Sequence, residues 1–112
     1  MSQSDIQEVE ITIEQARKQI KMRDAVERLM NNQDFKDIVL EQYLREEAVR
    51  LVHLKADAQM QDERRQRNMD MGIAGIGLFR VFCERIQREG DEAEEALDGH
   101  LETLDQVQSE ID

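Results

Sequence analysis

The residues in this chain that are best suited to chemistry are two histidines and one cysteine. His53 lies between Val52 and Leu54, with Glu47 and Asp57 one or two helical turns away. A metal or acid–base role would need a second ligand or partner, and the sequence places none beside it. We therefore expect a half-buried, hydrogen-bonded histidine at this position.

Cys83 and His100 lead to a similar expectation. Cys83 follows Phe82 and has neither an adjacent histidine nor a Cys-x-x-Cys partner, so nothing in the sequence indicates a lowered thiol pKa. We expect it to pack as a small apolar residue. His100 falls within an apolar periodic segment, where its protonation could make helix pairing pH-sensitive; the alternative is that it points outward.

No other motif indicates catalysis. The run GIAGIG at residues 72–77 is not followed by the Lys-Ser/Thr pair of a phosphate-binding loop. No pair of carboxylates stands out among the many acidic residues. The sequence therefore predicts no catalytic, cofactor-binding or metal-ligating residue, and we expect that the protein is not an enzyme.

The composition predicts an all-α protein. Of the 112 residues, 37% are charged and 4% aromatic, and proline is absent; such a chain favours helices with long solvated faces. The uncharged run from Met71 to Phe79 is too short to span a membrane. With no secretory signal and one cysteine, we expect a soluble intracellular protein.

The charge is distributed unevenly. Residues 1–90 contain 17 Asp/Glu and all 15 Lys/Arg, whereas residues 91–112 contain nine Asp/Glu and no basic residue. This divides the chain into a helical body, 1–90, and an acidic amphipathic tail, 91–112. Direct binding to nucleic acid is disfavoured because phosphate contacts need clustered cations, and a basic protein surface is a better partner.

Hydrophobic periodicity predicts three to four helices. After a frayed or extended lead-in, a capping box at Thr12 predicts a first helix over residues 13–30. The pair Asn31-Asn32 predicts a turn, and the polarity of residues Asp57 to Gln61 predicts a second break, although that segment has no glycine or proline. A second helix over residues 34–56 has a wide apolar stripe, and we expect it to form the core pair with the next helix. The expected architecture is a helical hairpin, a long glycine-notched helix and an acidic amphipathic C-terminal helix.

The next helix, around residues 69–86, is apolar on nearly every side. One side carries Met71, Ala74, Leu78, Val81 and Phe82, and the other carries Met69, Ile73, Ile76, Cys83 and Ile86. Gly72 and Gly75 form a notch on the arc shared with Phe79, so a second backbone or a large side chain could approach closely there. The alternative is that the glycines mark a loop between two shorter helices. Either arrangement needs partners that cover the apolar surface.

A cluster of three arginines precedes this helix, at Arg64, Arg65 and Arg67. Two interpretations are open. The cluster is either the solvated first turns of the helix or a docking patch for an acidic surface, such as the tail of a neighbouring copy.

The C-terminal segment predicts a final helix with Gly90 as the preceding stop and Asp91 as its N-cap. One apolar stripe contains Ala93, Ala96, Leu97, His100, Leu101, Leu104, Val107 and Ile111. The helix is too short to be stable alone, so we expect it to lie on a partner. The predicted interaction residues are Gly72, Gly75, Phe79, Phe82, Ile86, Leu97, Leu101, Leu104, Val107 and Ile111.

One set of residues, spread over about residues 32–97, carries a resemblance to a known family. The set consists of Phe35, Lys36, Tyr43, the run from Glu47 to Leu54, Gly90 and the run from Glu92 to Leu97. In this set the sequence resembles a group of small helical proteins that tailed bacteriophages encode among their structural genes. These are packing residues. The resemblance implies a virion or assembly role, with the protein in the host cytoplasm during assembly or in the particle.

Three functions follow as hypotheses. The first is a non-enzymatic assembly protein of a phage particle, either a virion component or a scaffolding factor, which self-associates or packs on a larger structural protein. The second is an acidic DNA mimic that inhibits a host nucleic-acid enzyme, although residues 1–90 are nearly neutral. The third is a helical chaperone or adaptor that holds a client helix.

Overall fold

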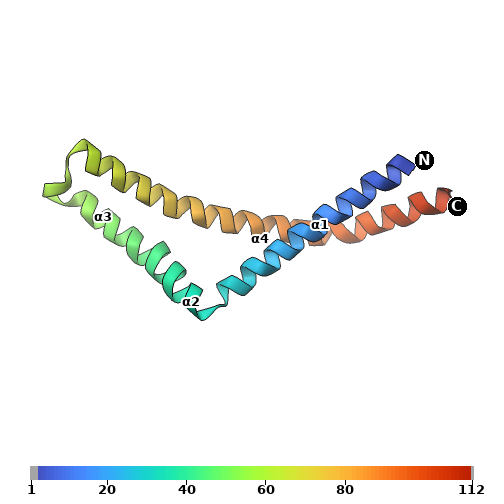
Figure 1. The fold of residues 1–112 in the computed structure, drawn as a ribbon, viewed down its shortest axis with the longest axis horizontal. Coiled ribbons are helices and arrows are strands. Elements are labelled where there is room, and N and C mark those ends of the chain that lie inside the picture. The colour runs from blue at the N-terminus through green and yellow to red at the C-terminus, as the bar shows by residue number, and fades with distance from the viewer. Residues whose placement is uncertain (1–2, 112) are drawn as a thin grey trace. The chain divides into compact units, whose positions relative to one another are not determined.

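The computed structural model describes residues 3–111, which form an all-α structure, and the fold-class prediction is confirmed (Figure 1). Helix α1 spans Gln3–Met30. A second helical segment consists of α2, Gln33–Phe35, the π-helix η1, Lys36–Glu47, and α3, Ala48–Ala56. The 3-10 turn η2, Ala58–Met60, leads into α4, Glu63–Ile111. Three long helical segments result, within the predicted three to four.

The chain divides into two compact units. The terminal unit contains Met1–Glu27 and Arg85–Asp112, and the hairpin unit contains Arg28–Glu84. Helix α4 contributes its first part to the hairpin unit and its last part to the terminal unit. The expected boundary between residues 90 and 91 falls within α4 and within the terminal unit.

The terminal unit is an antiparallel pair of helices, with the two ends of the described chain at one end of the pair (Figure 1). Its buried apolar residues are Ile13, Ala16 and Val26 from α1 and Ala93 and Val107 from α4. Val107 is only 2% exposed. The apolar stripe of the acidic tail therefore packs on α1 of the same chain.

Two predicted helix boundaries in the terminal unit are wrong. Helix α1 starts at Gln3 rather than after Thr12; residues 1 and 2 of the expected lead-in lie outside the described residues. The Thr12 hydroxyl donates to the Glu8 carbonyl at 3.0 Å, within the helix, instead of capping an N-terminus. Packing against α4 stabilises these early turns, since helices in proteins depend more on tertiary contacts than on local signals.

The predicted stop at Gly90 and N-cap at Asp91 are also wrong, because α4 continues through both residues. Gly90 is buried and does not adopt a positive φ. Its lack of a side chain serves packing, because the aliphatic part of Arg23 lies directly against it. A glycine that permits close helix contact resembles a helix stop when only the sequence is read.

In the hairpin unit the predicted turns are confirmed. The Asn32 side chain accepts a hydrogen bond from the Phe35 backbone at 3.0 Å, which caps the second helical segment. The predicted polar break after Ala56 is present, and there the Asp57 carboxylate accepts from the Gln59 backbone at 2.8 Å. The Asn32 cap begins the first arm of the hairpin unit, and the Asp57 cap orders the 3-10 turn between the two arms.

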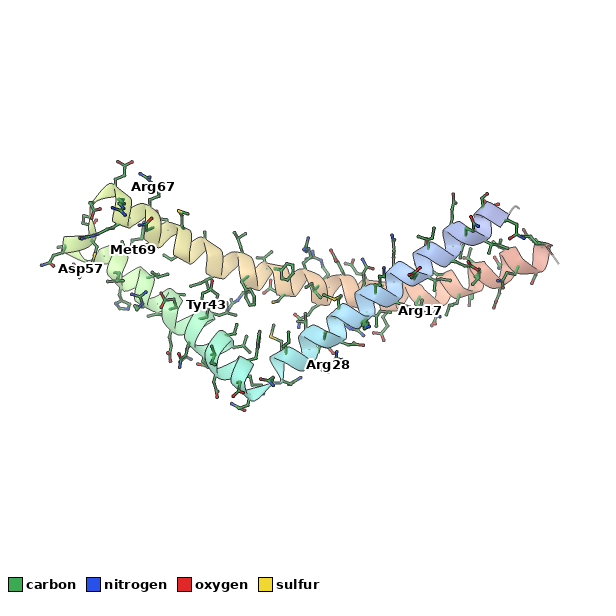
Figure 2. All side chains as sticks on the ribbon, in the orientation of Figure 1. Arg17, Arg28, Tyr43, Asp57, Arg67 and Met69 are labelled. Carbon is green, nitrogen blue, oxygen red and sulfur yellow. The ribbon has the colours of Figure 1, made fainter. Side chains whose placement is uncertain are left out.

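The two arms of the hairpin unit meet along η1, α3 and the first part of α4. Tyr43 extends from η1 toward α4, and its ring meets Phe79 edge to face with centroids 6.2 Å apart (Figure 2). Near the closed end, Lys55 Nζ lies 2.6 Å from a carboxylate oxygen of Asp70. The predicted pairing of these two helices is confirmed, although no residue of the second helical segment is fully buried.

Candidate protein interaction surface

The structure brings no catalytic cluster together around His53. The imidazole is exposed on α3, which corrects the expected half-buried position. Its two acidic neighbours are engaged elsewhere, since Glu47 accepts hydrogen bonds from Arg50 and Asp57 caps the turn at Gln59. Within residues 3–111, no three His, Cys, Asp or Glu side chains are grouped to hold a metal ion.

Cys83 is a buried free thiol on α4. Burial, followed by the negative charge of Glu84, raises the pKa of this thiol. A raised pKa keeps the thiol protonated and a poor nucleophile at neutral pH. The prediction that Cys83 packs as a small apolar residue is confirmed.

His100 is half-buried in the terminal unit. It lines a groove of about 260 Å³ between α1 and α4, together with Ala16, Gln19 and Glu92. The residue therefore lies at the edge of the helix pair, and a pH-sensitive pairing through His100 stays a prediction.

The main surface feature of the hairpin unit is an apolar stripe on α4, which we call the outer stripe. It consists of Met71, Ala74, Leu78, Val81 and Phe82. All five are exposed, with exposed fractions of 66% for Met71, 69% for Leu78, 58% for Val81 and 50% for Phe82. Large apolar side chains at helical spacing on one face form a continuous patch, which is unusual on a surface that stays in water.

The opposite face of the same helix is covered. Met69, Ile76 and Cys83 are at most 8% exposed, and Ile73 is half-buried. The sequence placed these residues and the outer stripe on two sides of one helix, and the structure confirms that division. The loop alternative for the glycines is wrong, because α4 is continuous through them.

The glycine notch is filled from within the hairpin unit. Leu51 lies against Gly72, at 3.0 Å from where a Cβ would stand, and the Tyr43 hydroxyl lies 4.0 Å from the equivalent point at Gly75. Phe79 is half-buried beside Tyr43. Of the predicted interaction residues in this unit, only Phe82 belongs to the outer stripe.

The remaining predicted interaction residues lie in the terminal unit. Ile86, Leu97, Leu101 and Leu104 are half-buried, Val107 is buried and Ile111 is exposed. Leu101 and Leu104 line an apolar groove of about 330 Å³ with Ile13 and Arg17 of α1. This stripe holds the tail on its own chain.

Sequence reasoning missed the polar centre of the terminal unit, Arg23. This side chain is 8% exposed, and its Nη1 lies 2.9 Å from Asp91 and 2.6 Å from Glu94 across the helix pair. Hydrogen bonds that the guanidinium donates to Glu94, Asp24 and Asp91 raise its pKa, so its charge is permanent. The signal in the sequence was Gly90, which could have been interpreted as space for a long side chain.

The arginine cluster forms the first turns of α4, as the solvated interpretation predicted. Arg65 lies near Asp62 and donates to the Gln59 carbonyl, and Arg67 lies 3.4 Å from Glu63. Arg64 is exposed and makes no ion pair within the described part of the chain. Its use as a docking patch stays a prediction.

No helix among residues 3–111 has the length and apolar character needed to cross a membrane. Comparison with known protein families, with curated proteins and with solved structures gave no match.

Proposed function

We propose that this chain is a non-enzymatic helical assembly protein that works by binding other protein surfaces through the outer stripe of α4. The observation that carries the proposal is the exposure of Met71, Leu78 and Val81, each more than half exposed on one helix face. Covering a large aliphatic side chain contributes about 1.5–3 kcal/mol. A partner that covers several of them gains enough to offset part of the cost of association.

The resemblance to phage structural proteins indicates that this binding takes place during the assembly of a phage particle. In that setting the protein packs on a second copy or on a larger structural protein of the particle, either as a virion component or as an assembly factor in the host cytoplasm. The unequal surfaces of the two units support such a role. The terminal unit covers its own apolar stripe, whereas the hairpin unit leaves one open.

The geometry of the tail favours this proposal over a DNA mimic. A mimic needs carboxylates directed outward at phosphate-like spacing. Asp91 and Glu94, although their side chains are largely exposed, pair with Arg23 of the same chain, so part of the negative charge of the tail is neutralised internally. These two carboxylates hold the helix pair together.

The first test measures mass in solution by size-exclusion chromatography with light scattering. We expect association for the unmodified chain and its loss in the variant Leu78→Gln with Val81→Gln. The matched control is Ile11→Gln with Met22→Gln, which alters apolar residues of the terminal unit that are also more than half exposed. Circular dichroism should show unchanged helix content in both variants, since all four positions are exposed.

The second test asks whether the chain belongs to a particle. Mass spectrometry of purified phage particles and assembly intermediates should detect it at a fixed ratio to the major structural protein. The stripe variant should be lost from these particles and the control variant retained. A chain that is monomeric at all concentrations and also absent from every particle would contradict the proposal.

A further inference from the structure

Four residues of the outer stripe lie on a single seam of α4. They are Met71, Ala74, Leu78 and Val81, spaced by three, four and three residues. All four are exposed, and one unbroken helix within the hairpin unit holds them, which fixes their relative positions. This spacing is that of the contact seam between two paired helices. The seam is therefore suited to a second helix rather than to a broad, flat surface.

We propose that this seam pairs antiparallel with the same seam of a second copy, and this rests on the proposed function of the outer stripe. In the register that we infer, Leu78 of one copy packs on Ala74 of the second copy. Met71 packs on the second copy's Val81. The large Leu78 side chain thereby meets the smallest residue of the stripe, so the facing residues interlock. A two-fold axis relates the copies, and every contact occurs twice.

The apolar residues and the arginines select this register. If the second copy moves by one heptad in one direction, Leu78 faces its Arg67. A move in the other direction leaves half of the seam facing residues outside the stripe. A parallel pair is unfavourable as well, because Arg64 and Arg67 would each face the same arginine of the second copy. Only the inferred register covers all four seam residues with apolar residues.

The centre of the seam leaves room for a second helix to approach closely. Gly77 adjoins the seam, and no atom lies within 4 Å of the point where its Cβ would stand. Ala74 beside it carries only a methyl group. Small residues at a contact allow two helix axes to come close together. The other arm of the hairpin unit does not fill this space, because it covers the opposite face, where Met69, Ile76 and Cys83 are buried.

The charged residues near the two ends of the seam are complementary under the same two-fold axis. Arg67 precedes Met71 by four residues, and Glu84 follows Val81 by three at the flank of the stripe. Antiparallel pairing brings Arg67 of one copy close to Glu84 of the second copy. Arg67 pairs at 3.4 Å with Glu63, whose side chain is 91% exposed, so water screens that contact. Glu84 is exposed and makes no ion pair in the described part of the chain.

A swap of the large and the small residue tests the proposal. Ala74→Leu and Leu78→Ala should each raise the dimer dissociation constant at least about tenfold, because one overfills the contact and the other leaves a cavity. The double variant again places one large and one small residue at every contact, so its dissociation constant should return to within about threefold of the unmodified value. Sedimentation equilibrium measures the four proteins. Circular dichroism should show unchanged helix content in each, since both positions are exposed.

Disulfide cross-linking reports the register directly. In chains that carry Cys83→Ala, Ala74→Cys and Leu78→Cys are introduced separately, and the two proteins are mixed after one of them is labelled with a heavy isotope. The inferred register predicts disulfides between the two variants, because positions 74 and 78 face each other across the copies. The matched control is Arg80→Cys, which is exposed on α4 but lies off the stripe and should not form such disulfides.

Three results would overturn the inference. The first is an unmodified chain that stays monomeric. The second is a double variant that dimerises no better than either single variant, and the third is the absence of disulfides between Ala74→Cys and Leu78→Cys. The proposed function is judged separately, because loss of the variant Leu78→Gln with Val81→Gln from particles would still show that the outer stripe binds a partner.

Discussion

The two units of this chain use helix pairing in opposite ways. The terminal unit contains 16 Asp/Glu and six Lys/Arg, and the apolar stripe of its acidic helix is covered by α1. The hairpin unit is nearly neutral, with ten acidic and nine basic residues, and α4 has an apolar face on both sides there. The other arm of the hairpin unit, η1 and α3, can cover only one of those two faces of α4. The acidic unit is therefore complete in itself, whereas the neutral unit has a surface that remains to be covered.

The largest expected effect concerns the close contact in the terminal unit. Gly90→Ala should destabilise the protein by about 1–3 kcal/mol, because the added methyl group would collide with the Cβ of Arg23 on the facing helix. Gly99→Ala is the control from the same helix, since open space surrounds that position. Thermal unfolding followed by circular dichroism measures both. Equal stability of the two variants would show that the helices are not packed closely at Gly90.

A smaller effect is expected from the polar centre of the same unit. Arg23→Gln should lower the midpoint of thermal unfolding, and the loss should shrink as salt concentration rises, because Asp91 and Glu94 are largely exposed to solvent. Arg17→Gln, which removes an exposed arginine from the same helix, is the matched control. Similar midpoints for the two variants at low salt would contradict a structural role for the Arg23 cluster.

In the hairpin unit the expected effect has the opposite sign. Gly77→Ala should stabilise the unit by about 0.5–1 kcal/mol, because a Cβ there meets no other atom and alanine favours the helix. Gly72→Ala is the comparison, since its Cβ would press on the Leu51 side chain. Chemical denaturation should give a higher free energy of unfolding for Gly77→Ala than for the unmodified chain. The value for Gly72→Ala should be lower than that for Gly77→Ala. The reverse order would mean that the outward face of α4 is already occupied.

The smallest expected effect concerns the reactivity of the Cys83 thiol, and it leaves stability at neutral pH unchanged. Burial raises the pKa of Cys83, so alkylation by iodoacetamide at pH 8 should be slower in the folded chain than in urea. A thiol with a raised pKa favours the folded state below its unfolded pKa, and this contribution is lost as pH rises through the folded value. The alkylation rate of Cys83 in the folded chain should therefore increase at higher pH. Equal rates in folded and unfolded protein would place Cys83 on the surface.

The sequence predicted some features of the fold well because they depend on local chemistry. The Asn31-Asn32 pair located the first turn, where the Asn32 side chain is the cap, and polarity alone located the break where Asp57 caps the 3-10 turn. The two faces of the apolar helix followed from spacing alone. The sequence could not show which of those faces a second helix covers, because that depends on contacts between distant residues.

The errors have the same origin. Thr12 and Gly90 carry signals that begin or end helices in isolation, and packing between α1 and α4 overrides both. The π-helical geometry of η1 also has no signal in the sequence that we can identify. A π-helix turns through a smaller angle per residue than an α-helix, so projection at α-helical pitch could not assign the faces of residues 36–47 correctly.

The most direct measurement of the central claim is oxidation footprinting of the methionines in the unmodified chain. Met71 is 66% exposed on the outer stripe, Met22 is 53% exposed in the terminal unit and Met69 is buried, so three internal probes report on one sample. When protein concentration rises, or when particles are present, we expect the oxidation of Met71 to slow toward the rate of Met69 while Met22 stays reactive. A Met71 that remains as reactive as Met22 under every condition would contradict the claim that this face binds a partner.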